Sequence, residues 1–175
     1  MDKKKWKKDK FFTAFTTAWG PVGATANEVG ITRVILPAYQ MEDLLGLLQW
    51  EHPNAKRADE IFSDFIEQAR NYFNAKSADF SNVAIDLPAE DTFYGMIYRA
   101  ARNVEYGKTV SYLDLAKQIS KPESVRALAT GLGKNPTPLI VPCHRIIYSS
   151  GKIGGFSAAG GIPLKKRMIE LEKRK

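Results

Sequence analysis

The only cysteine of the chain, Cys143, lies in the apolar segment LIVPCHRIIY and is followed directly by His144 and Arg145. A thiol reacts as its thiolate, and a nearby positive charge or a positioned base favours that form. His144 could supply the base, and Arg145 could supply a positive field or a structural ion pair. Adjacent side chains rarely point together, so contact between Cys143 and His144 would need a turn or a bridging water. A lone cysteine in an apolar segment is usually a buried structural residue, so nucleophilic chemistry needs support from other features.

The composition excludes several other kinds of chemistry. One Cys rules out an internal disulfide, and one Cys with two His argues against a Cys/His zinc site. No apolar run approaches the roughly 18 residues that a membrane span needs. A charged fraction of 26% and 11% aromatic residues argue against global disorder. We expect a soluble, globular protein without a metal site, located in the cytoplasm, or in the nucleus if the source is a eukaryote.

The net charge of +7 is distributed unevenly along the chain. Residues 1–10 carry +4, residues 11–91 carry −7 and residues 92–175 carry +10. A basic C-terminal half suggests contact with a polyanion such as DNA. The lysine-rich ends also fit a simple role in solubility, so charge alone leaves DNA binding open.

The N-terminal half predicts an α/β domain behind a basic flexible tail at residues 1–10. Residues 11–19 and 30–36 are rich in Phe, Thr, Ile and Val and flank a Gly/Pro/Asn-bearing stretch, which predicts strand, turn and strand. The start of the chain resembles a secretory signal peptide, but Thr, Gly and Pro residues interrupt its apolar stretch. We therefore favour a basic tail that leads into a first strand. Apolar spacing predicts helices over residues 41–50 and 58–74.

A polar joint at Pro88 to Asp91 predicts a domain boundary, and the preceding stretch, Phe80 to Leu87, is a strand or an extended connection. Beyond it, helical apolar spacing begins near Phe93. Ser111 is expected to start a further helix, and Pro122 suits the first turn of another that runs to about Gly133. Two short helices joined by a tight turn form a helix-turn-helix, although most such pairs are only packing units.

The stretch 106–172 resembles the C-terminal domain of the O6-alkylguanine-DNA alkyltransferases, or methylated-DNA–protein-cysteine methyltransferases. Four motifs match in order: Tyr106-Gly107 with SYLDLA at 111–116, Arg126-Ala127 leading to Asn135-Pro136, PCHR at 142–145, and Gly160-Gly161 with Lys165 and Glu172. The spacing makes the match specific, because Asn135 stands eight residues before Cys143 and nine after Arg126. Clear similarity covers residues 92–172.

The resemblance implies a two-domain α+β fold. An α/β domain resembling ribonuclease H would occupy residues 1–90, and a helical, winged-helix-like helix-turn-helix domain would occupy residues 91–175. It also implies irreversible transfer of an alkyl group from O6 of guanine, or less well O4 of thymine, to Cys143, once per molecule and without a cofactor. The partner would be double-stranded DNA containing O6-alkylguanine, and we expect a monomer.

An alkylated base in a duplex is hidden in the stack and must be flipped out to react. By resemblance, Arg126 fills the gap left by that base, and Tyr112 promotes the rotation and contacts the bound base. Arg145 is also expected to contact DNA. Arg126 could instead be an ordinary surface arginine that pairs with phosphate, and Tyr112 could instead be an aromatic residue buried on its helix.

Small residues leave one side of the second helix narrow, which suits entry into a minor groove only ~6 Å wide; they are Ala127, Ala129 and Gly131. By resemblance this helix is the recognition helix and enters the minor groove. The alternative for the same residues is close packing between helices.

The expected chemistry uses Cys143 as nucleophile, His144 as base through a water, and Glu172 to orient and charge His144, as in hydrolytic triads. Asn135 is expected to tie the turn near the cysteine, and the Cys143 backbone and the Tyr112 hydroxyl would donate to the departing guanine. Glu172 could instead lie on a solvated face of the terminal helix, beside Glu170. Asn135 could instead belong to a plain Asn-Pro turn without a role at the cysteine. The substrate pocket is expected to include four residues: Tyr112, Gly154, Gly155 and Ser157.

The chain departs from the family pattern at several positions. Tyr98 stands where Trp is common, Leu128 and Ala129 replace Val and Gly, and the loop after Phe156 is longer than usual, so Ser157 is assigned by position alone.

Three other functions compete with alkyl transfer. They are lesion binding without chemistry, which the presence of Cys143 opposes; Cys-dependent hydrolysis, which the helix-turn-helix and Arg126 oppose; and a regulatory role in which the cysteine senses alkylation.

Overall fold

The computed structural model describes residues 9–173, so most of the predicted basic tail, residues 1–8, lies outside the described residues. The chain divides after Asp86 into two compact units. Strands and helices are both present, which confirms the expected α+β class. Across residues 9–173, no helix is long and apolar enough to cross a membrane.

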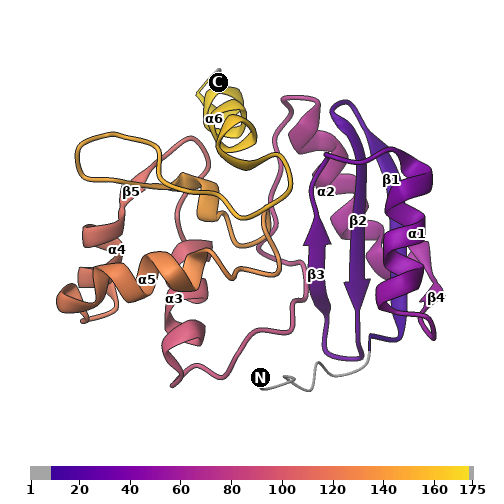
Figure 1. Ribbon diagram of the computed structural model, residues 1–175, viewed down its shortest axis with the longest axis horizontal. Helices are drawn as coiled ribbons and strands as arrows, with labels where there is room; N and C mark the ends of the chain where they lie inside the picture. Colours follow the sequence, from indigo (N-terminus) through magenta and orange to yellow (C-terminus); the bar gives the residue numbers. More distant parts are fainter. Residues whose placement is uncertain (1–8, 174–175) are drawn as a thin grey trace. The chain divides into compact units, whose positions relative to one another are not determined.

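The first unit is built on a four-stranded sheet with the order β3-β2-β1-β4 (Figure 1). Its strands are β1 (Phe11–Thr17), β2 (Gly20–Ala26), β3 (Ile31–Ile35) and β4 (Lys56–Arg57). β1, β2 and β3 pair antiparallel, and β4 joins β1 in parallel. The stretch 80–87, predicted as a strand or an extended connection, begins with a turn at residues 81–82 and then runs beside the start of β3, with a bridge between Ile31 and Ile85.

The turn predicted between residues 19 and 30 is wrong, because most of that stretch is β2, a central strand of the sheet. Its small residues suit this position. A Cβ on Gly23 would lie 3.0 Å from the side chain of Leu44, so a larger residue would push helix α1 off the sheet. Local preference for a turn is thus overridden by packing, as β-propensity commonly is.

Two helices cover the opposite faces of this sheet, α1 (Met41–Glu51) and α2 (Ser63–Phe73), and both confirm predicted helices. Side chains alternate between the two faces along a strand. Phe12 of β1 packs with Leu44 and Leu48 of α1. Phe15, three residues on, meets Phe65 of α2 edge to face, with ring centroids 5.8 Å apart.

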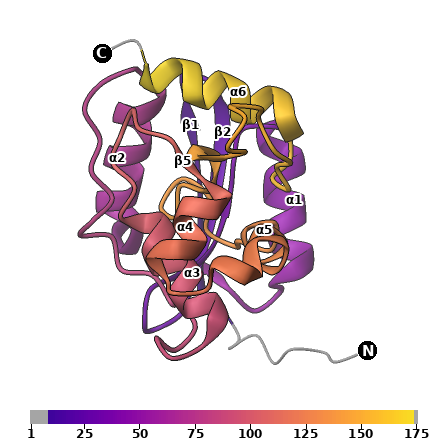
Figure 2. The ribbon, with the colours of Figure 1, turned by 90° about the vertical axis from the view of Figure 1, so that its left-hand side faces the viewer.

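The second unit is mainly helical (Figure 2). Its helices are α3 (Phe93–Arg102), α4 (Tyr112–Gln118), α5 (Val125–Leu132) and α6 (Gly161–Glu172). A short parallel pair, β5 (Val110–Ser111) with β6 (Ile146–Ile147), links the segment before α4 to the segment after the cysteine. Helices α3, α4 and α5 pack against one another in pairs.

The helix-turn-helix prediction agrees with the local structure of α4 and α5. The Ser111 hydroxyl oxygen accepts a hydrogen bond from the Asp114 N–H at 3.0 Å and so caps the start of α4. Pro122 opens a 3₁₀ turn, Pro122–Ser124, that leads directly into α5. Gly133 caps the end of α5, where the sequence places it.

Candidate active site

The cysteine lies at the start of a 3₁₀ turn, Cys143–Arg145, and its side chain is almost completely buried. Asn135 holds it in place from the preceding loop. The Asn135 amide nitrogen donates both to the Cys143 sulfur at 3.2 Å and to the carbonyl of Val141 at 2.8 Å. Its oxygen accepts from the Thr137 N–H at 3.0 Å. One side chain therefore links the thiol to two other points of the loop, in the position expected from the sequence.

The loop before the cysteine contains a strained residue that the sequence does not reveal. Leu139 has a φ of 79°, in the left-handed region that branched residues avoid. Its side chain is only 1% exposed, and the Val141 N–H donates to the Thr137 carbonyl across it at 2.9 Å. Burial and this hydrogen bond hold a conformation that costs on the order of 1–3 kcal/mol.

Behind the cysteine, His144 and Glu172 form a buried pair. The His144 Nε2 lies 2.6 Å from Glu172 Oε1. The other carboxylate oxygen accepts from the Arg145 Nε at 2.9 Å and from the Gly107 N–H at 3.0 Å. Burial alone would raise the pKa of Glu172, but the hydrogen bonds from His144 and Arg145 and the positive charge of Arg145 outweigh it and lower the pKa to about 2.

The ionised carboxylate determines which nitrogen of His144 can act as a base. Burial lowers the pKa of His144 below its ordinary value, more than the opposing effect of Glu172 raises it, so the ring is neutral at pH 7. A carboxylate can only accept hydrogen bonds, so Nε2 must carry the ring proton and donate a hydrogen bond to Glu172. The lone pair of the neutral ring is then on Nδ1, which can accept a proton.

The thiol needs such a base. Burial raises the pKa of Cys143, although the Asn135 hydrogen bond, the charge of Lys165 and nearby backbone N–H groups oppose that shift. The resting group is therefore the neutral thiol, and the same neighbours are placed to stabilise the thiolate once the proton leaves.

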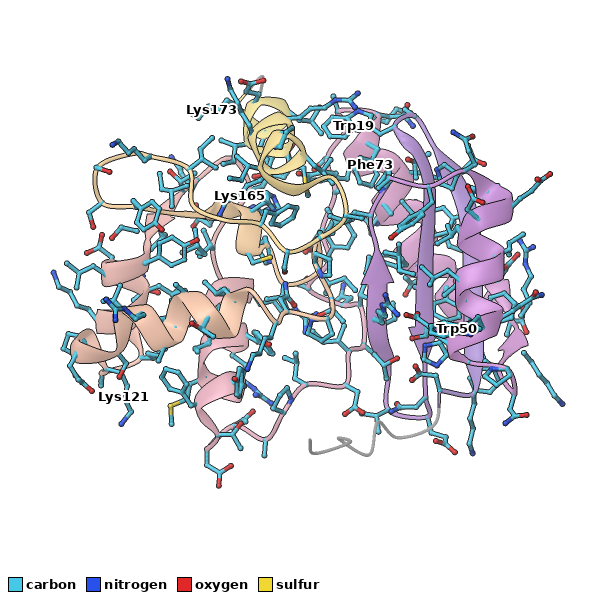
Figure 3. All side chains as sticks on the ribbon, viewed as in Figure 1. Trp19, Trp50, Phe73, Lys121, Lys165 and Lys173 are labelled. Carbon is cyan, nitrogen blue, oxygen red and sulfur yellow. The ribbon has the colours of Figure 1, made fainter. Side chains whose placement is uncertain are left out.

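Lys165 belongs to this site, although the sequence motif that contains it predicts no role for it. It lies on α6 (Figure 3) and is 1% exposed. Its ammonium donates to the carbonyls of Ile146 at 2.6 Å and Gly155 at 3.4 Å, and it lies 5.7 Å from the centre of the Tyr112 ring. Burial lowers the pKa of Lys165 to about 8. Its spacing of seven residues from Glu172 places both on one face of the helix, a signal the sequence contains.

Replacing Lys165 with Met should slow the reaction of the Cys143 thiol with iodoacetamide at pH 7 by roughly tenfold or more, because a nearby positive charge favours the thiolate. The pH profile of that rate should move to higher pH. Lys166→Met is the matched control, since Lys166 is exposed and, among the residues that the structure describes, pairs with Glu170 alone, at 3.9 Å. Equal pH profiles for the two variants would show that the charge of Lys165 does not act on the thiol.

A cavity of about 460 Å³ opens beside the cysteine. Its walls come from α4, α5, the 3₁₀ turn of the cysteine, the residue after β6 and the glycine-rich loop at residues 151–161. They are Tyr112, Arg126, Ala129, Thr130, Leu132, Gly133, Cys143, Tyr148, Gly155, Phe156 and Ser157. Three of the four expected pocket residues, Tyr112, Gly155 and Ser157, are among them. Burial raises the pKa of Tyr112 to about 12, so its hydroxyl keeps its proton at neutral pH.

Gly154, the fourth expected pocket residue, does not line this cavity. A Cβ at this position would lie 2.5 Å from the Tyr112 hydroxyl oxygen. The missing side chain therefore makes room for Tyr112, and Gly154 supports the pocket wall from behind.

Two of the expected DNA contacts are also wrong. Arg145 is buried; besides its bonds to Glu172, it donates to the Val104 carbonyl at 2.6 Å, and its guanidinium lies over the Tyr106 ring. Gly131 is buried against α3, where a Cβ would lie 2.9 Å from Ile97. Its small size serves helix packing, which was the alternative interpretation.

The other residues assigned to DNA binding lie where α5 borders the cavity or faces solvent. Arg126 is exposed and lines the cavity, Ala127 is exposed, and Ala129 is half-buried and lines the cavity. The buried face of the same helix carries Leu128, which is fully covered.

Comparison with known proteins places these features in a family. The domain described as "6-O-methylguanine DNA methyltransferase, DNA binding domain" matches residues 92–174. A methylated-DNA–protein-cysteine methyltransferase of Sulfolobus acidocaldarius is 40% identical over 114 residues, which cover 65% of this chain and 69% of that protein. One from Mycobacterium tuberculosis is also 40% identical, but over 112 residues that span 64% of this chain and 66% of that relative, just under two thirds of its length.

Solved structures extend the similarity to almost the whole chain. Mycobacterium tuberculosis OGT in complex with DNA matches with a TM-score of 0.75 and 31% identity, covering 93% of this chain and 92% of that chain. An O6-methylguanine DNA methyltransferase from Methanococcus jannaschii matches with a TM-score of 0.65 and 25% identity, covering 93% and 94%. The chain therefore belongs to the methylated-DNA–protein-cysteine methyltransferase family.

Proposed function

We propose that this protein repairs double-stranded DNA by transferring the alkyl group of O6-alkylguanine, and less well that of O4-alkylthymine, to its own Cys143. The observation that supports this most strongly is the thiol at the wall of an open cavity with the His144–Glu172 pair behind it. A purely structural cysteine would have no use for a cavity or a base.

The proposed reaction begins with loss of the thiol proton, through a water, to Nδ1 of His144. The thiolate attacks the alkyl carbon, the bond between that carbon and O6 breaks, and its electron pair leaves with the guanine. Tyr112 donates a proton to the departing base, and the proton held by His144 replaces it. The thiol proton thus ends on guanine, and the product is a thioether that water does not readily hydrolyse, so each molecule reacts once.

This balance of protons and electrons involves no cofactor. The backbone N–H of Cys143, which the sequence suggested as a second donor, already donates to the Val141 carbonyl at 2.8 Å. We therefore assign the donation to the Tyr112 hydroxyl, which borders the cavity and retains its proton at neutral pH.

We further infer that α4 and α5 act as a helix-turn-helix, with α5 entering the minor groove. Its exposed Arg126 and Ala127 support this, because a narrow, basic helix face suits that groove. The β5–β6 pair next to these helices supports a winged-helix-like domain over residues 91–175, and the helices on both faces of the first sheet support a ribonuclease-H-like domain over residues 1–90. Action as a monomer in the cytoplasm, or in the nucleus of a eukaryote, remains part of the proposal.

Incubating the protein with a duplex that contains O6-methylguanine should add the mass of one methyl group, located on the peptide that contains Cys143. The mass should stop increasing after one addition, even with excess substrate. An intact mass that stays unchanged under reducing conditions would refute alkyl transfer. Methylation at any other residue would refute the assigned nucleophile.

A further inference from the structure

One wall of the cavity is formed by a tyrosine that the proposed reaction does not use. Tyr148 follows β6 directly, and 52% of its surface is exposed. Large aromatic side chains usually bury most of their surface, so an exposed ring at the wall of a functional cavity offers apolar area to a ligand.

The backbone of Tyr148 is firmly held at this position. Its N–H donates to the Lys152 carbonyl at 3.0 Å, and its own carbonyl accepts from the Gly151 N–H at 2.9 Å. These two bonds close a tight turn immediately after β6. The ring is therefore presented by an anchored turn rather than by a long free loop.

The neighbours of the Tyr148 ring leave its surface available. It packs against Tyr112 with centroids 5.3 Å apart and planes tilted by 52°, so the two rings are not stacked face to face. Phe156 lines the same cavity from the glycine-rich loop. Three aromatic side chains from different segments thus surround one opening beside the thiol, an arrangement that suits a flat, aromatic occupant.

We propose that Tyr148 is a further substrate-contacting residue, whose ring stacks on the purine base that is everted from the duplex and holds it in the cavity for attack by Cys143. This inference rests on the proposed function, since the flat occupant of the site is the flipped base. Stacking of a base on an aromatic ring is independent of its alkyl substituent, so Tyr148 contributes to binding of the base and not to the chemistry at sulfur.

The test compares Tyr148→Ala and Tyr148→Phe with the unchanged protein. The measured quantities are the rate constant for methyl transfer from a duplex containing O6-methylguanine at subsaturating DNA, the affinity for the unmodified duplex, and the rate of Cys143 alkylation by iodoacetamide. Tyr148→Ala should lower the transfer rate constant by roughly 5- to 150-fold, the usual effect of removing one base-stacking ring. The other two quantities should not change, and Tyr148→Phe should retain most of the transfer rate.

Ile162→Ala is the control, because Ile162 is 51% exposed in the same unit and does not line the cavity. A transfer rate that is unchanged in Tyr148→Ala would overturn the stacking role, and so would equal losses in the Ala and Phe variants. A loss matched by weaker binding of unmodified DNA would show that the ring contacts the DNA backbone instead. Absence of transfer in the unchanged protein would refute the proposed function itself, and the role of Tyr148 with it.

Discussion

Replacing Cys143 with Ala or Ser is expected to abolish methyl transfer from O6-methylguanine while leaving binding to the methylated duplex intact. Alanine has no nucleophile, and a serine hydroxyl is a much weaker one because it stays protonated. Neither change touches the surface of α5 that we assign to DNA. Intact-mass spectrometry and an equilibrium binding measurement on the same preparations check both parts of the expectation.

The serine variant separates chemistry from folding. A hydroxyl preserves an acceptor for the Asn135 amide, which also donates to Val141, so the loop keeps its connections. We expect the free energy of unfolding to change by about 1 kcal/mol or less in either variant. Guanine restored by the alanine variant would reveal another nucleophile. Loss of DNA binding together with transfer would show that the thiol itself contributes to docking.

Glu172→Gln is expected to slow methyl transfer by roughly 10²- to 10⁴-fold, the usual contribution of a positioned general base. An amide can present its NH₂ group to His144 Nε2, which then accepts a hydrogen bond and leaves the ring proton on Nδ1, the nitrogen that must take the thiol proton. Single-turnover rates with the methylated duplex measure this loss. Glu170→Gln should react as the unchanged protein does, because Glu170 is exposed and its one ion pair within the described part of the chain is with Lys166.

The same substitution should destabilise the fold by about 3–5 kcal/mol, because it leaves the buried Arg145 guanidinium without its counter-charge. The stability of the unchanged protein should also depend on pH in a defined direction. The folded pKa of Glu172, about 2, lies below its ordinary value of 4.5, so its stabilisation is complete above pH 4.5 and is lost as the pH falls toward 2. Denaturant unfolding across this range checks it.

His144 adds to the acid sensitivity. The pKa of His144 in the folded chain lies below its ordinary value of 6.5. Below pH 6.5 the unfolded chain therefore binds a proton on His144 that the folded chain does not bind, and the free energy of unfolding decreases. Glu172→Gln should remove the part of the pH dependence that falls below pH 4.5. An unchanged acid limb in that variant would contradict the low pKa of Glu172.

The helices were predictable because their signals are local. Apolar spacing over residues 41–50 and 58–74, the cap at Ser111 and the proline at 122 each act within one or two turns of chain. The strand β2 was not predictable in this way. Its Gly, Pro and Ala residues suit a turn locally, and only the close approach of α1 makes small residues necessary in the middle of a sheet.

The sequence was enough to predict the nucleophile and the base of the reaction that we propose, because a single cysteine followed by His144, and motifs at family spacing, leave few alternatives. The surroundings of the charged and aromatic side chains became visible only in the folded chain. Arg145 is buried on Glu172 instead of facing DNA, Lys165 enters the site, and Tyr148 reaches the cavity. The physical reason is that burial and partners depend on segments far apart in the chain, and a linear pattern records a side chain's type but not its neighbours.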